Sequence, residues 1–342
     1  MRLPPGFRIE RLASVPSARG MAWSPAGTLF VGSRSGEVWA LTGYGRGALT
    51  RHRLATGLEQ PVGVAFRDGD LYVSAVSRIL RLRDIEPRLV APPAAEVVSA
   101  AYPADRAHGW KFIAFGPDGL LYVPVGAPCN ICAPDPERYA VITRLDVRRP
   151  GAVPEVVARG VRNSVGFDWH PRTRELWFTD NGRDQMGDDN PPDELNRLPT
   201  GRAGAHFGFP FCHGGTLPDP DFGGVGRCAD ALAPAARLDA HGAALGMRFY
   251  TGTQFPPAWR GRIFMAQHGS WNRSRKSGYR VLTATLDAQG RVRDVRPFAS
   301  GWLDEKTQQA WGRPADVSVA PDGALLVSDD YAGAIWRISY RP

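Results

Sequence analysis

The sequence predicts an all-β fold, a six-bladed β-propeller that occupies residues 1–342 as a single domain. Two observations predict it. A unit made of a turn and short apolar strands recurs six times at a spacing of roughly 40 to 50 residues, which is typical of propeller blades. The 39 glycines and 30 prolines also suit many tight turns, and hardly any stretch has helical periodicity. Length alone would equally allow two domains.

Each unit opens with a turn rich in Gly, Pro or Asp and continues with short apolar strands. In order, the turns and their strands fall at residues 24–27, 28–31 and 37–41; 67–69, 70–73 and 78–82; 116–119 and 120–125, after a strand at 112–115; 170–173 and 175–179; 258–261, 262–266 and 280–283; and 320–323, 324–328 and 334–338. Residues 7–12 form an extra strand, which we expect to pair with the last unit and close the ring. The spacing widens after the third, fourth and fifth units, which predicts loop insertions on one face.

The net charge of +8 and the pI of about 9.6 raise the question of a nucleic-acid partner. Lys and Arg are scattered, apart from residues 273–276, so we expect no nucleic acid. A plain solvated basic surface would explain the charge, and a small anionic ligand held by a few arginines is the functional alternative. No stretch reaches the roughly 20 apolar residues of a membrane span.

Four cysteines lie in loops rich in Gly and Pro: Cys129, Cys132, Cys212 and Cys228. An even number in loops indicates disulfides and an oxidising compartment, so we expect a periplasmic or secreted protein. Three pairings are possible, and Cys129–Cys132 with Cys212–Cys228 is favoured. Residues 1–12 show no signal-peptide pattern, as expected of a mature chain.

A polar residue precedes the first strand of each unit at a similar distance from the turn. These residues are Arg19, Gln60, His108, Arg162 and Arg313, with His241 as a looser match in the fifth unit. Because the inner strands of a propeller surround its central channel, we expect these side chains to converge at one mouth and bind an anion. Polar groups that merely hold water are the alternative.

The insertion in the fourth unit, residues 180–194, holds six carboxylates among Gly, Asn and Pro. Oxygen donors on a turning backbone are what calcium prefers, although the spacing is not that of an EF-hand. A solvated acidic loop explains these carboxylates equally well. The sequence contains no GxSxG, HExxH or phosphate-binding glycine motif.

Several segments resemble one family, the soluble quinoprotein sugar dehydrogenases, and within it the sorbosone dehydrogenase-like and aldose dehydrogenase-like branch. They are HGWKFIAFGPDGLLYVPVGAPCN, GVRNSVGFDWHP, FTDNG with DELN, HFGFP, HGSWNR and GRPADV. The resemblance covers nearly the whole chain. It implies a six-bladed propeller that carries pyrroloquinoline quinone (PQQ) and calcium at the top of the channel. It also implies oxidation of an aldose or a sugar-derived aldehyde such as sorbosone, with a separate electron acceptor.

The resemblance gives His108 the role of general base, which removes the hydroxyl proton while hydride leaves the sugar. Arg162 and Asn163 match the pair that holds the quinone, and Arg313 matches a cation that pairs with the cofactor carboxylates. Gln60 joins this cofactor set from the polar ring. The calcium ligands would be the carbonyls of Gly182, Arg183 and Phe207 and the carboxylate of Glu194.

Two positions depart from the family pattern. Ala315 stands where the family has a second Arg, and the segment 268–273 replaces its usual Lys; we expect Arg273 to supply the missing cation. Trp110, Trp271 and Trp311 lie near the predicted mouth, where they could stack on a sugar or the quinone or simply pack. A calcium-dependent lactonase-type propeller and a propeller that binds without catalysis are the alternative functions.

Overall fold

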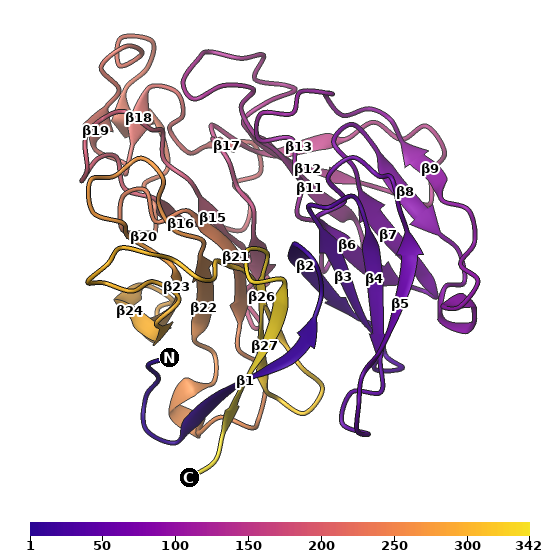
Figure 1. Cartoon of the computed structure of the whole chain (residues 1–342). Coiled ribbons are helices and arrows are strands. Elements are labelled where there is room, and N and C mark those ends of the chain that lie inside the picture. The colour runs from indigo at the N-terminus through magenta and orange to yellow at the C-terminus, as the bar shows by residue number, and fades with distance from the viewer.

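The computed structural model describes residues 1–342, and its strands form six sheets arranged as the blades of a propeller (Figure 1). The predicted fold is therefore confirmed. Within each blade, neighbouring strands pair antiparallel from the inside of the ring outward, except that the outermost strand of the third blade is parallel to its neighbour. The first three blades contain β2 (Ala18–Trp23), β3 (Leu29–Ser33), β4 (Val38–Thr42) and β5 (Thr50–Ala55); β6 (Val64–Arg67), β7 (Asp70–Ser74), β8 (Ile79–Leu82) and β9 (Glu96–Ser99); and β10 (Ala114–Phe115), β11 (Leu121–Val125), β12 (Val141–Leu145), β13 (Glu155–Arg159) and β17 (Ala205–His206).

The remaining three blades follow the same plan with longer insertions. They contain β14 (Phe167–Trp169), β15 (Leu176–Asp180), β16 (Glu194–Leu198) and β20 (Ala236–Arg237); β21 (Ala244–Phe249), β22 (Ile263–Gln267), β23 (Arg280–Leu286) and β24 (Val292–Ser300); and β25 (Pro314–Val319), β26 (Leu325–Asp329), β27 (Ala334–Tyr340) and β1 (Phe7–Ser14). A separate hairpin joins β18 (Cys212–His213) to β19 (Leu217–Pro218). The only helices are the 3₁₀ turns Glu86–Arg88, Cys228–Asp230 and Pro257–Trp259, and none is long and apolar enough to cross a membrane.

The ring is closed by β1, which pairs antiparallel with β27 in the sixth blade. The register runs from Phe7 opposite Tyr340 to Ser14 opposite Ala334, with an irregularity between Arg11 and Ala13. Three strands from the end of the chain and one from its start thus share a sheet. The predicted closing strand is confirmed, and it extends two residues beyond the predicted range.

The hydrophobic core is divided among the six interfaces between neighbouring blades. Because alternate side chains of a strand point to opposite faces, one strand supplies two interfaces. In β22, Ile263 and Met265 pack toward the fourth blade, whereas Phe264 and Ala266 pack toward the sixth. The other interfaces are built in the same way, as between the first and second blades and between the sixth and first.

Glycines directly before the inner strands β6 and β14 let neighbouring blades approach closely around the axis. A Cβ atom on Gly63 would lie 2.1 Å from the carbonyl oxygen of Lys111, and one on Gly166 would lie 2.4 Å from that of Leu245. Real Cβ contacts are never so short, so a side chain at either position would push the blades apart.

The insertions carry both disulfides. Cys129 pairs with Cys132 in the loop between β11 and β12, and Cys212 pairs with Cys228 beside the β18–β19 hairpin, so no cysteine is free. These are the favoured pairings. The loops around them gather where the inner strands begin, and there they form the walls of a pocket.

Candidate active site

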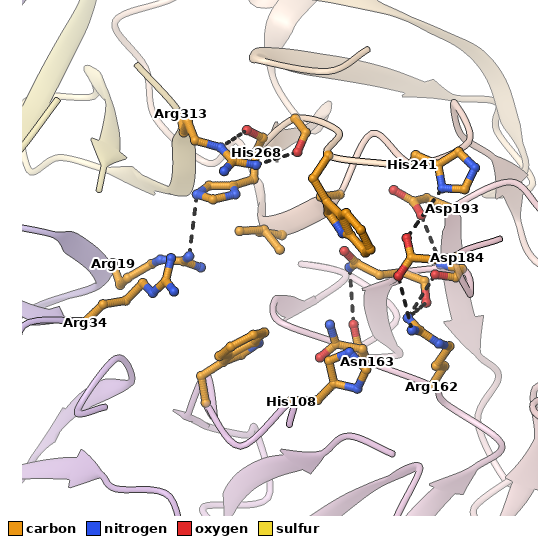
Figure 2. Close-up of a pocket in the computed structure, with 17 residues that line it drawn as sticks. Arg19, Arg34, His108, Arg162, Asn163, Asp184, Asp193, His241, His268 and Arg313 are labelled. Atoms are coloured by element: carbon orange, nitrogen blue, oxygen red, sulfur yellow. Dashed lines mark hydrogen bonds and ion pairs between the residues drawn. The ribbon is translucent and has the colours of Figure 1, made fainter. Parts of the chain in front are cut away.

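A polar pocket of about 240 Å³ opens at this end of the ring (Figure 2). Its walls come from five blades, which explains how residues far apart in the sequence meet there. The lining residues are Arg19, Arg34, His108, Trp110, Arg162, Asn163, Asn181, Gly182, Asp184, Asp193, His241, Ala243, Leu245, His268, Gly269, Trp271 and Arg313. Below them, Val165, Leu245 and Ala315 form an apolar floor against which Trp110 packs.

His108 presents a neutral imidazole to the pocket. Its Nδ1 lies 2.8 Å from the carbonyl oxygen of Ala127, and because a carbonyl only accepts, Nδ1 carries the proton. Burial, and then the charge of Arg162, lowers the pKa of His108 to about 4. Nε2 therefore keeps an unprotonated lone pair near neutral pH, as a general base requires.

The backbone around His108 is held in place by hydrogen bonds from Lys111. His108 adopts a left-handed conformation with φ of 49°. The buried ammonium of Lys111 donates to the carbonyls of Gly109, at 2.9 Å, and Val76, at 2.6 Å. These bonds hold the HGWK segment as an ordered turn rather than a free loop.

Most of the N–H groups of Arg162 donate to protein oxygens and are not available to a ligand in the pocket. Its Nε and Nη2 donate to the main-chain and side-chain oxygens of Asn130, at 2.8 and 3.0 Å. Its Nη1 donates to the carbonyls of Asn181 and Gly182, at 3.1 and 2.9 Å. With four of five N–H groups bonded within the chain, Arg162 ties together the loops that form one wall.

This wall also holds the acidic residues of the pocket, and we call it the acidic wall: Arg162, Asp184, Asp193 and His241 (Figure 2). The buried carboxylate of Asp193 accepts from the backbone N–H of Gly182 and of Ala244, at 3.0 Å each, and burial raises its pKa to about 6. His241 bonds through Nε2 to the carbonyl of Gly187 at 2.8 Å. Asn163 lines the same pocket as His108.

The opposite wall, the basic wall, consists of Arg19, Arg34, His268 and Arg313 (Figure 2). Behind it, one buried carboxylate, Asp330, accepts from Arg19 at 2.8 Å, from His268 at 2.7 Å and from Arg34 at 3.4 Å. Burial alone would raise the pKa of Asp330, but the charge of Arg19 and the hydrogen bond from His268 lower it well below its usual value. Burial, and then the charge of Arg19, lowers the pKa of His268 to about 3, so His268 is neutral.

Arg313 and Arg34 keep donors free for a ligand. Arg313 donates from Nε and Nη2 to the carbonyls of His268 and Gly269, at 3.0 and 2.6 Å, and its Nη1 has no protein partner. Arg34 makes a single long bond, and its guanidinium lies 5.8 Å from the ring centre of Trp110. The basic wall can therefore receive an anion without breaking protein contacts.

A second, much smaller cavity of about 10 Å³ lies behind the acidic wall. Gly182, Glu194 and Phe207 line it together with Asp180 and His213. Burial raises the pKa of Glu194 to about 7, and burial together with the charge of Glu194 raises that of Asp180 well above its usual value. Two buried carboxylates beside backbone carbonyls are the kind of oxygen set that calcium takes.

No three His, Cys, Asp or Glu side chains surround one metal position, so a cation there would depend on backbone carbonyls. The Gly182 carbonyl already accepts from Arg162, and its second lone pair is available. Arg183 does not line this cavity, and its guanidinium pairs with Asp219 and Asp221 at 2.7 and 3.0 Å.

Some residues singled out from the sequence lie outside the pocket. Gln60 does not line it, and its buried Oε1 has no hydrogen-bond partner. Arg273 donates to the carbonyl of Asp188 and to the carboxylate of Asp189. Trp311 packs against Trp302 and Trp336, whereas Trp271 lines the pocket with 73% of its surface exposed.

Sequence reasoning overlooked Arg34 and Asp193 as pocket residues. Arg34 follows β3 and stands outside the repeated position that selected the polar ring, so no signal pointed to it. Asp193 was noted only as one carboxylate of the acidic insertion. It is buried directly before β16, and nothing in the sequence distinguishes it from the other carboxylates of that insertion.

A family model described as Glucose / Sorbosone dehydrogenase matches residues 146–337, more than half of the chain. An uncharacterized protein of Borreliella burgdorferi is 31% identical over 364 aligned residues, which cover 100% of this chain and 91% of that protein.

Solved structures are similar in fold. The calcium structure of a Trichoderma reesei enzyme of carbohydrate-active family AA12 has a TM-score of 0.81 at 18% identity, covering 99% of this chain and 97% of that one. The holo form of the PQQ domain of pyranose dehydrogenase from Coprinopsis cinerea has a TM-score of 0.80 at 19% identity, covering 99% and 96%.

Proposed function

Since this chain belongs to the glucose/sorbosone dehydrogenase family, we propose that it is a PQQ- and calcium-dependent dehydrogenase. Its substrate would be an aldose or a sugar-derived aldehyde of the sorbosone type, and a separate protein or small molecule would accept the electrons. The observation that carries the proposal is a neutral histidine with a free Nε2 in a pocket whose facing wall offers unpaired guanidinium donors.

The residues present fit a tricarboxylate quinone. Arg313 has an unbonded Nη1, Arg34 is bonded only weakly, and Trp110 and Trp271 offer flat apolar faces in the same pocket. When bound, PQQ supplies a quinone that accepts hydride, and calcium supplies a Lewis acid that polarises it. Gly182, Glu194 and Phe207 would hold the calcium, with Asp180 as a neighbouring carboxylate.

The chain's own contribution begins with proton transfer. His108 would take the hydroxyl proton of the sugar on Nε2, while its Nδ1–H remains on the Ala127 carbonyl and keeps the ring oriented. A charged imidazole formed in this way would lie near Arg162, and that repulsion favours rapid loss of the proton afterwards. Asn163, which lines the same pocket as His108, would donate to a ligand oxygen from its side-chain amide.

The disulfides bear on the location of the protein. Two disulfides persist in an oxidising compartment, which supports a periplasmic or secreted location.

A lactonase-type hydrolase would need several carboxylates around a metal on the axis. The floor there is apolar, formed by Val165, Leu245 and Ala315, which favours the dehydrogenase.

The test is a titration of purified cofactor-free protein with PQQ, with and without calcium, followed by absorbance. Dye reduction is then measured with a panel of aldoses and sorbosone. Stoichiometric binding that depends on calcium, together with dye reduction, is expected. No binding of PQQ would overturn the proposal, and binding without turnover on any sugar would favour the non-catalytic alternative.

A further inference from the structure

In the short loop closed by Cys129 and Cys132, Asn130 bonds to two residues that line the pocket, Arg162 and Asp184. The Asn130 Oδ1 accepts from Arg162 Nη2 at 3.0 Å and from the backbone N–H of Asp184 at 2.8 Å. Its Nδ2 donates to the carbonyl of Asp184 at 3.2 Å, and its own carbonyl accepts from Arg162 Nε at 2.8 Å. Asn130 therefore binds two residues of the acidic wall at once.

Arg162 links Asn130 to the segment of Asn181 and Gly182, which lines the pocket. From Asn130 its guanidinium reaches across to the carbonyls of Asn181 and Gly182, and only 4% of its surface is exposed. If Asn130 moved, two N–H groups of a buried cation would lose their acceptors. The arginine would then have to find new partners, and the 181–184 segment would be released with it.

The same loop also orients His108. Ala127, whose carbonyl holds the His108 Nδ1–H, lies two residues before Cys129. Ala127 packs with Ala140 and Phe209 in a small core that Cys129 and Ile131 cover. The loop has no regular secondary structure, so the disulfide and this core are what limit its motion.

We propose that Asn130 is a positioning residue, which the Cys129–Cys132 disulfide holds in place and which acts on the pocket through Arg162. The loop sets the acidic wall and the orientation of His108 relative to each other. Its effect on cofactor affinity and turnover rests on the proposed function, whereas its effect on Arg162 does not.

The first experiment is a double-mutant cycle on PQQ binding. Asn130→Ala is expected to raise the dissociation constant about tenfold, in the range found for residues that orient ligand-binding groups. In an Arg162→Ala background the same change should have no further effect, because Asn130 acts through that arginine. Asn130→Asp keeps the acceptor oxygen for Arg162 but loses the donor to the Asp184 carbonyl, so it should recover part of the affinity. Gln289→Ala, which removes an exposed amide in a distant turn, is the matched control.

The second experiment needs no cofactor. In a ¹⁵N spectrum of the arginine side chains, the Arg162 Nη2–H, which donates to the Asn130 Oδ1, should exchange slowly with solvent, and Arg162→Lys identifies its signal. Asn130→Ala and the pair Cys129→Ser with Cys132→Ser should each speed this exchange about tenfold or more. Thermal unfolding of each variant establishes that it is folded.

The two experiments separate the possible failures. If wild-type protein does not bind PQQ, the proposed function fails, but the exchange measurement still tests the role of Asn130. Unchanged Arg162 exchange in both variants, or fully additive effects in the binding cycle, would overturn the inference.

Discussion

The two walls of the pocket use the same residue type in opposite ways. On the acidic wall, Arg162 donates four hydrogen bonds to Asn130, Asn181 and Gly182. On the basic wall, Arg313 leaves Nη1 unbonded, and Arg34 makes one bond of 3.4 Å. An arginine with most of its donors engaged by the protein shapes a site, whereas one with free donors can bind a ligand.

The two neutral histidines of the pocket also differ in whether Nε2 is free for a ligand. Substituting them is expected to give the largest difference in turnover. His108 has a free Nε2, whereas the Nε2 of His268 is bonded to Asp330. His108→Ala should lower turnover by about 10²-fold or more with little change in PQQ affinity, because a general base is lost. His268→Ala should lower turnover far less. Steady-state dye reduction and absorbance titration measure the two quantities, and equal losses of turnover in the two variants would erase the distinction.

The pH dependence follows from the protonation state of His108. Its pKa is lowered, so the base is neutral above about pH 4 and becomes inactive only as pH falls through that value. In the cofactor-free protein, the His108 ring signals in an NMR titration should therefore show no change between pH 8 and about pH 5. A titration near pH 6.5 would show that the imidazole is not buried as the structure has it.

Removing one arginine from each wall should separate affinity from stability. Arg313→Ala should raise the PQQ dissociation constant about tenfold, and it should destabilise the protein less than Arg162→Ala, because Arg313 makes two hydrogen bonds to carbonyls where Arg162 makes four hydrogen bonds to protein oxygens. Arg162→Ala should weaken PQQ binding too, but it should also destabilise the protein by about 2 kcal/mol or more, because buried carbonyls lose their donor. Calorimetry and chemical denaturation provide both values. Equal stability losses would mean that the walls do not differ.

The smallest effect is expected at the rim. Trp271 lies at the pocket with most of its ring exposed, so Trp271→Ala should raise KM for the sugar a few-fold and leave kcat unchanged. Trp311→Ala is the comparison, because that ring packs on Trp302 and Trp336 away from the pocket. It should lower the thermal midpoint and leave KM unchanged.

The sequence predicted the blades well because their signal is local. Repeated turns and strand alternation are set by neighbouring residues, and even the closing strand could be foreseen as the one strand left over. The pocket was predicted in part: His108, Arg162, Asn163 and Arg313 line it, but Gln60 and Arg273 do not. The conformation of the loops decides which of these residues reach the pocket. Arg273 is drawn to Asp188 and Asp189 by a loop contact that no spacing rule reveals.

The pairing of β1 with β27 has a consequence during synthesis on the ribosome. Its partners, such as Phe7 and Tyr340, are separated by nearly the whole chain, so the first strand must wait unpaired until the last has been translated. Five blades can assemble before that moment, with two open sides exposed. Completion of the ring therefore cannot precede the synthesis of β27, and a nascent chain halted before β27 would display β1 as an exposed edge to other molecules.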